Sequence, residues 1–175
     1  MGLLDGKKVL IITDDIYEDL ELWYPKLRMI EEGAQVDVAA PKKQRITGKN
    51  GYPLEPDLTI DEVKTSDYEV LIIPGGYAPD KLRRYPRALE IVRDFDNDKR
   101  PIAFICHGGW VPISAKVVKG VRLTAVCAIK DDLENAGATW VDEPCVRDGH
   151  IVTAQVPKDL PAFCQAILQA VAERR

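Results

Sequence analysis

Short apolar runs, rich in β-branched residues, alternate along the chain with segments of helical periodicity. Four of these runs lie at 8–13 (KVLIIT), 35–40 (QVDVAA), 70–74 (VLIIP) and 102–105 (IAFI). Continuous apolar runs of this length are typical of strands buried on both faces, and strands that alternate with helices form parallel sheets covered on both sides. We therefore predict an α/β fold, a three-layer sandwich with a mostly parallel central sheet.

Two apolar stripes and two turn-rich segments complete the predicted architecture. The segment 145–153 alternates around Asp148-Gly149 and predicts a hairpin, and 41–56 is rich enough in turn residues for another. In each of two segments, helical spacing places apolar residues on one stripe of a helix. The second stripe is expected to be buried. The first stripe consists of Leu20, Tyr24, Leu27 and Ile30, and the second of Leu160, Phe163, Cys164, Ile167, Leu168 and Val171.

Length and charge exclude several classes of protein. The chain has 175 residues and is predicted to form one domain, residues 1–175, because domains commonly contain roughly 100–200 residues. Its 24 Lys and Arg against 28 Asp and Glu give a net charge of −4, which disfavours a nucleic-acid partner. The longest uncharged run, 101–115, is too short to cross a membrane, and the N-terminus lacks the layout of a signal peptide. We expect a cytoplasmic protein.

The motifs of common cofactor sites are missing. The four cysteines are scattered without a CxxC pair, so we expect no metal site. Pro74-Gly75-Gly76 matches neither a dinucleotide-binding loop nor a P-loop. We accordingly predict an activity that needs no cofactor.

Three loops at the predicted carboxyl ends of strands carry the candidate functional residues. In parallel sheets, sites form where such loops converge. The loop 14–19 holds several acids, although acids at the start of a helix are also explained by the helix dipole. The loop 75–80 begins with Gly75 and Gly76, whose bare amides suit an oxyanion or a substrate.

The third loop, 106–110, carries the sharpest signal. Cys106 stands where a buried strand gives way to a predicted helix, a position at which the helix dipole lowers a thiol pKa and favours the nucleophilic thiolate. Gly108 matches the second glycine of a nucleophile elbow. His107 is adjacent, but neighbouring residues on a helix point about 100° apart, so we do not expect it to face its own Cys106 thiol.

Four segments in order resemble the ThiJ/PfpI superfamily, and most closely its PfpI-type intracellular protease branch. They are 17–21 (YEDLE), 74–80 (PGGYAPD), 103–108 (AFICHG) and 129–132 (IKDD). The similarity covers nearly the whole chain. It implies a flavodoxin-like sandwich that assembles into homodimers or trimers of dimers.

The resemblance also implies roles for individual residues. Cys106 would be the nucleophile, and Glu18 would approach its sulfur as a protonated carboxyl donor. The amides of Gly76 and His107 would form the oxyanion hole. Asp80 would pair with His107 across a subunit interface, where the protease prototype has the longer Glu.

Trp110 stands where the protease prototype has Gln, and we expect its ring to narrow the pocket mouth. Together with Gly75 and Gly76 it is a candidate substrate-binding residue.

The leading hypothesis is a cysteine-dependent hydrolase of PfpI type, acting on small carbonyl or peptide substrates. The alternatives are a cofactor-free glyoxalase III or deglycase that acts on methylglyoxal-type carbonyls, and a non-enzymatic redox-sensing stress protein. A reactive thiol is common to all three, so the motif alone does not separate them.

Overall fold

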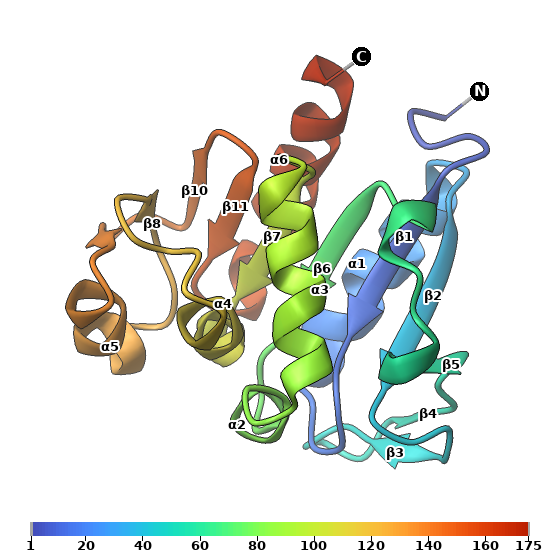
Figure 1. Ribbon diagram of the computed structural model, residues 1–175. Helices are drawn as coiled ribbons and strands as arrows, with labels where there is room; N and C mark the ends of the chain where they lie inside the picture. Colours follow the sequence, from blue (N-terminus) through green and yellow to red (C-terminus); the bar gives the residue numbers. More distant parts are fainter. Residues whose placement is uncertain (1, 175) are drawn as a thin grey trace.

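The computed structural model describes residues 2–174 and contains a seven-stranded sheet in the order β10-β11-β7-β6-β1-β2-β5 (Figure 1). All neighbouring strands are parallel except β10, which runs antiparallel to β11. The four predicted strands and the 145–153 hairpin are therefore confirmed. The strands are β1 (Lys8–Ile12), β2 (Gln35–Ala40), β5 (Leu58–Thr59), β6 (Val70–Ile73), β7 (Ile102–Ile105), β10 (Cys145–Asp148) and β11 (Ile151–Ala154).

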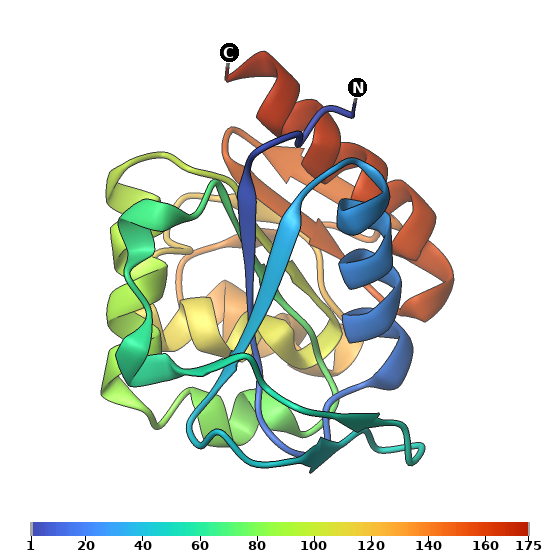
Figure 2. The same ribbon diagram turned by 90° about the vertical axis from the view of Figure 1, so that its right-hand side faces the viewer.

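Helices cover both faces of this sheet. In Figure 2 the blue α1 (Asp19–Glu31) and the red α6 (Leu160–Glu173) lie on one side, and the yellow-green α3 (Pro86–Asn97) lies on the other. Each side has its own apolar core. One core includes Phe163 of α6, and the other includes Phe95 of α3. The predicted three-layer, flavodoxin-like sandwich is confirmed. None of the helices within residues 2–174 is long and apolar enough to cross a membrane.

Short elements connect the layers. The predicted hairpin within 41–56 is present as the antiparallel pair β3 (Ile46–Thr47) and β4 (Pro53–Leu54). The remaining elements are α2 (Ala78–Leu82), α4 (Trp110–Ala115), α5 (Lys130–Asn135), the parallel pair β8 (Arg122–Leu123) and β9 (Thr139–Trp140), and the 3₁₀ turns η1 (Ile60–Glu62), η2 (Thr65–Asp67), η3 (Cys106–Gly109), η4 (Cys127–Ile129) and η5 (Pro157–Asp159).

The two apolar stripes have opposite fates. The stripe of α6 is buried as expected, and Cys164 is 1% exposed. The stripe of α1 faces outward, with Leu20 and Leu27 57% and 59% exposed and with Tyr24 and Ile30 also exposed. Helix α1 packs on the sheet through a different face, which buries Glu21, Leu22, Pro25 and Met29. An outward apolar stripe of this kind marks a surface that other protein can cover.

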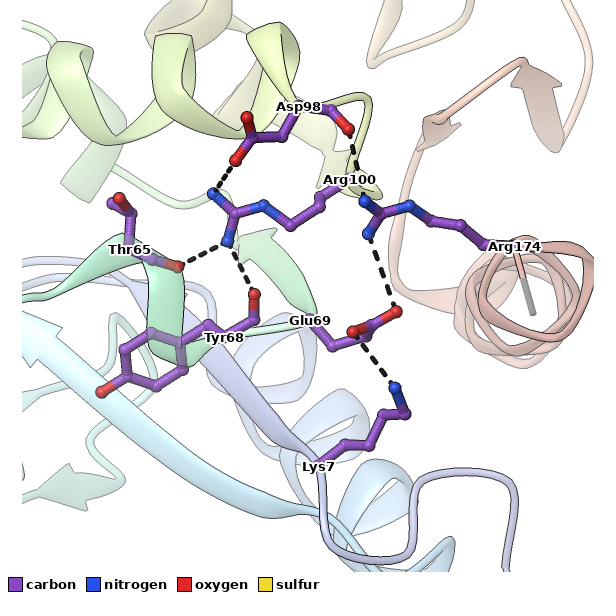
Figure 3. A network of polar contacts seen from close by, with 7 residues as sticks. All are labelled: Lys7, Thr65, Tyr68, Glu69, Asp98, Arg100 and Arg174. Atoms are coloured by element: carbon purple, nitrogen blue, oxygen red, sulfur yellow. Dashed lines mark hydrogen bonds and ion pairs between the residues drawn. The ribbon is translucent and has the colours of Figure 1, made fainter.

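A polar network joins the ends of several elements where the sheet strands begin (Figure 3). Its centre is Arg100, which is only 7% exposed. Its guanidinium donates to the carbonyl oxygens of Thr65 and Tyr68 and pairs with Asp98 at 2.8 Å. Arg174 and Lys7 both form ion pairs with Glu69, which links the end of α6 to the start of β1. Arg100 is thus the donor to the carbonyl of Tyr68 and a second donor to that of Thr65, which also accepts the N–H of Tyr68.

We predict that Arg100→Met lowers the free energy of unfolding by roughly 1–3 kcal/mol, since it leaves the carbonyl of Tyr68 without a donor and removes one of the two donors to that of Thr65. The matched control is Arg122→Met, which removes an exposed ion pair with Glu143 and should cost at most about 1 kcal/mol. Urea unfolding measures both. Equal losses in the two variants would contradict the structural role of Arg100.

Candidate active site

Cys106 occupies a sharp turn between β7 and the helix that follows. Its φ of 58° is left-handed, a conformation that non-glycine residues rarely adopt and that costs of order 1–3 kcal/mol. Gly108 allows the turn to lie against β6, because a Cβ there would come within 2.5 Å of the carbonyl oxygen of Ile73. The predicted strand-to-helix elbow is thus present in the backbone.

His107 lies closer to the thiol than expected. Its Nδ1 is 3.5 Å from Sγ of Cys106, so the expectation that the ring faces away is wrong. The spacing of about 100° holds only between residues that are both helical, and the left-handed φ of Cys106 breaks that relation. Burial lowers the pKa of His107 below its ordinary value. The imidazole is therefore neutral at pH 7 and able to accept a proton.

The acid whose side chain interacts with Cys106 is Glu21 rather than Glu18. Glu18 is the N-cap of α1, and its carboxylate accepts the backbone N–H of Glu21 at 2.8 Å. Glu21 is fully buried, accepts the N–H of Gly75 at 2.9 Å, and interacts through its side chain with Cys106. Glu21, one helical turn later, thus takes the position beside the sulfur that the resemblance implied for Glu18, because the carboxylate of Glu18 caps the N-terminus of the helix. The sequence places Glu21 on one helix face with Pro25 and Met29, but only the packing of the helix decides that this face is the buried one.

The Glu21 carboxyl holds its proton near neutral pH. Burial, and then the nearby charge of Glu18, raise its pKa to about 8. A protonated carboxyl adds no negative charge beside the sulfur and can donate a hydrogen bond to it.

The thiol itself departs from the sequence prediction. Burial, and then the charge of Glu21, raise the pKa of Cys106 to about 12, so the expected lowering is wrong for the isolated chain. The predicted helix dipole is weak here because the turn begins as the short η3 rather than as an α-helix. When Glu21 carries its proton, its contribution to this rise disappears. The resting thiol is protonated and requires a nearby base, a role that neutral His107 can fill.

A small cavity opens above the sulfur. Its volume is about 280 Å³, and it is lined by Lys49, Gly76, Tyr77, Cys106, His107 and Trp110. The Trp110 ring stands edge-on to His107 at 5.1 Å between centroids, and its Nε1 donates to Asp132 at 2.9 Å. These contacts fix the indole as a wall of the cavity. Larger and more open hollows, such as one of about 580 Å³ beside Arg100, do not include Cys106.

The two glycines have different tasks. The amide of Gly75 is occupied by Glu21, so it is not available to a substrate. A Cβ on Gly75 would lie 2.5 Å from Oε1 of Glu21 and 2.9 Å from Cβ of Cys106, which explains why the chain has glycine here. Gly76, with a φ of 83°, lines the cavity.

Asp80 does not meet His107 within this chain. It is exposed on α2 and pairs with Arg84 at 3.0 Å. Within residues 2–174, no three His, Cys, Asp or Glu side chains are grouped so that they could hold a metal ion.

Comparison with known proteins identifies the family. The model of the DJ-1/PfpI family matches residues 7–170. This chain belongs to the DJ-1/PfpI family. Among curated relatives, Deglycase TK1284 of Thermococcus kodakarensis is 43% identical over 93% of this chain and 98% of its own. General stress protein 18 of Bacillus subtilis is 38% identical over 90% of this chain and 94% of its own.

A solved structure agrees with this assignment. A two-domain protein of Anabaena variabilis, with DJ-1/ThiJ/PfpI-like and ferritin-like domains, superposes with a TM-score of 0.93 at 34% identity. The match covers 95% of this chain and 48% of that protein, so this chain spans about half of its length. The predicted membership in the ThiJ/PfpI group and the prediction of a cysteine-dependent enzyme are confirmed.

We predict that Glu21→Gln changes how stability depends on pH. The pKa of Glu21 rises from 4.5 in the unfolded chain to about 8 in the folded protein, so the folded state binds more protons between these values. Wild type therefore loses stability relative to the variant as pH increases from about 5 to about 8.

Urea unfolding across that range measures the difference. Glu62→Gln is the control, since the pKa of Glu62 is lowered by its hydrogen bonds with Thr59 and its effect falls below this range. A constant difference between wild type and Glu21→Gln would contradict the buried, protonated carboxyl.

Proposed function

We propose that this protein is a deglycase. It removes methylglyoxal-type adducts from amines and thiols and converts the released carbon skeleton to lactate. The observation that carries the proposal is the cavity of about 280 Å³ in which the Cys106 thiol lies between a neutral imidazole and a buried carboxyl. Relatives with deglycase names, at 41–43% identity over nearly their whole length, support the same reaction class.

The first step transfers the adduct to the enzyme. His107 takes the thiol proton of Cys106 through Nδ1, and the sulfur bonds to the aldehyde carbon of the adduct. The bond from that carbon to the substrate amine or thiol breaks, and the leaving group receives a proton. In this proposal the amides of Gly76 and His107, two residues that line the cavity, stabilise the negative charge on the substrate oxygen, while Glu21 keeps a neutral donor beside the sulfur.

The second step is an internal redox exchange followed by hydrolysis. A proton leaves the carbon bonded to sulfur and another is added to the adjacent carbonyl carbon, through an enediol. The first carbon is thereby oxidised to a thioester and the second reduced to an alcohol. Water cleaves the thioester, giving lactate and the free thiol, so the overall reaction consumes one water and no external oxidant. Neutral His107 removes the first proton as a base, and the imidazolium formed in this way returns a proton to the adjacent carbon as an acid.

Peptide hydrolysis is the second candidate. The same nucleophile and oxyanion donors suit an amide bond. The walls formed by Tyr77 and Trp110 leave room for a small carbonyl compound rather than an extended peptide, so we rank deglycation first. A stress protein that only senses oxidants would retain the thiol without turnover.

Lactate formation from methylglyoxal tests the proposal. We expect Cys106→Ala to abolish it, and Cys127→Ala, which removes an exposed thiol, to leave the rate within about twofold of wild type. Glu21→Ala, which removes the neutral donor beside the sulfur, should lower kcat by roughly 10²–10³-fold, and Glu21→Gln, which keeps a neutral donor there, should lower it less. Equal lactate from wild type and Cys106→Ala would refute deglycation. Cys106-dependent cleavage of a peptide substrate without lactate formation would favour the protease alternative.

We also propose that the protein assembles from copies of itself, as homodimers or trimers of dimers. The exposed stripe of α1 supports this assembly, because a second copy would bury Leu20 and Leu27 against the same residues of its own. In such an assembly Asp80 of one subunit would approach His107 of another, as the family resemblance implies. Asp80 is exposed on α2, and its surface ion pair with Arg84 would be exchanged for that contact.

Leu27→Glu should shift the protein toward the monomer, since a charge would be buried in an apolar interface. Light scattering coupled to size-exclusion chromatography measures the mass. Glu90→Gln, on an exposed helix face elsewhere, is the control and should leave the mass unchanged. An unchanged mass for Leu27→Glu would place any interface on another surface.

A further inference from the structure

Lys49 has no part in the chemistry described so far, yet it lines the active-site cavity. The other lining residues are Gly76, Tyr77, Cys106, His107 and Trp110. Because the pKa of His107 is lowered by burial, its ring is neutral at pH 7. Lys49 therefore supplies the positive charge of the cavity wall.

This lysine forms no ion pair with the residues 2–174 that the structure describes. By contrast, Lys7 and Lys8 each lie within 3.3 Å of a carboxylate, on Glu69 and Asp37. A cation without a carboxylate partner is available to an anionic ligand. The positive charge of Lys49 acts on the reacting groups. It opposes the rise in the pKa of Glu21 and of Cys106, and it adds to the lowering of the pKa of His107.

The turn that carries Lys49 is held in place by Asp19. The carboxylate of Asp19 accepts the N–H groups of Asn50 and Tyr52, both at 2.9 Å. Gly48 fits against that carboxylate, since a Cβ there would lie 2.3 Å from Oδ1. The backbone N–H of Lys49 donates to the carbonyl of Tyr17 at 2.8 Å. The β3–β4 turn is thus fastened to the start of α1, and the base of the lysine is fixed beside the cavity.

We propose that Lys49 binds a carboxylate of the substrate and makes the enzyme prefer adducts on free amino acids or C-terminal residues over adducts inside a protein chain. This inference rests on the proposed deglycase function. A free amino acid keeps its carboxylate a few bonds from the modified amine or thiol, whereas an internal residue has a neutral amide there. Among the lining residues, Lys49 is the one with a charge complementary to that group.

Two matched substrates test the inference. They are the methylglyoxal hemithioacetals of N-acetylcysteine and of N-acetylcysteine amide, which differ only in the carboxylate. Wild type should have a kcat/KM about tenfold higher for the substrate that carries the carboxylate, mostly through a lower KM. A tenfold ratio corresponds to roughly 1.4 kcal/mol, the free energy of one charge-assisted contact. Lys49→Met should bring the ratio near one, and Lys49→Glu should invert it. Added salt should weaken the wild-type preference, because the lysine is exposed.

The control variant is Lys99→Met. Lys99 precedes β7 whereas Cys106 follows it, so this lysine lies at the other end of the strand and should leave the ratio unchanged. Equal ratios in wild type and Lys49→Met would overturn the role of Lys49 while leaving deglycation intact. A Lys49→Met variant that loses activity equally on both substrates would also overturn it, since the lysine would then serve the chemistry. If wild type turns over neither substrate, the proposed deglycase function fails instead.

Discussion

The active site depends on one buried carboxyl group. Glu21 is inserted between the backbone of the Gly75 loop and the Cys106 side chain, where its oxygen accepts an amide proton at 2.9 Å. An ionised carboxylate in this position would be costly, and burial therefore keeps the acid protonated near neutral pH. The neutral form joins three loops from separate strands without placing a negative charge beside the nucleophile.

Local strain accompanies this arrangement. Cys106 adopts a left-handed φ of 58°, and the neighbouring loop turns through Gly76 with a φ of 83°. Conformations of this kind persist when the surroundings determine them, and here β6 and β7 are buried on both faces. The packing of these two strands thus stabilises the strained turn. The turn brings Nδ1 of His107 to 3.5 Å from the sulfur, a contact that regular helix geometry would not allow.

Much of this could be predicted from residue patterns. Apolar runs such as 70–74 and 102–105 identified buried parallel strands, and their ends identified the loops that meet at the site. The position of Cys106 at the end of a strand was also readable, because strand-to-helix turns have a recognisable local pattern. The choice between Glu18 and Glu21 was not, since both acids begin the same helix and only packing decides which one points inward.

The sequence alone determined the order of strands and helices, the elbow that carries Cys106 and the family, because periodicity and short motifs are local properties of the chain. Only the tertiary structure decided which groups become buried together. It turned the apolar stripe of α1 outward, assigned the carboxyl to Glu21, raised the pKa of the thiol through burial, and placed Lys49 at the cavity. These outcomes depend on contacts between residues far apart in the chain, and local spacing does not encode them.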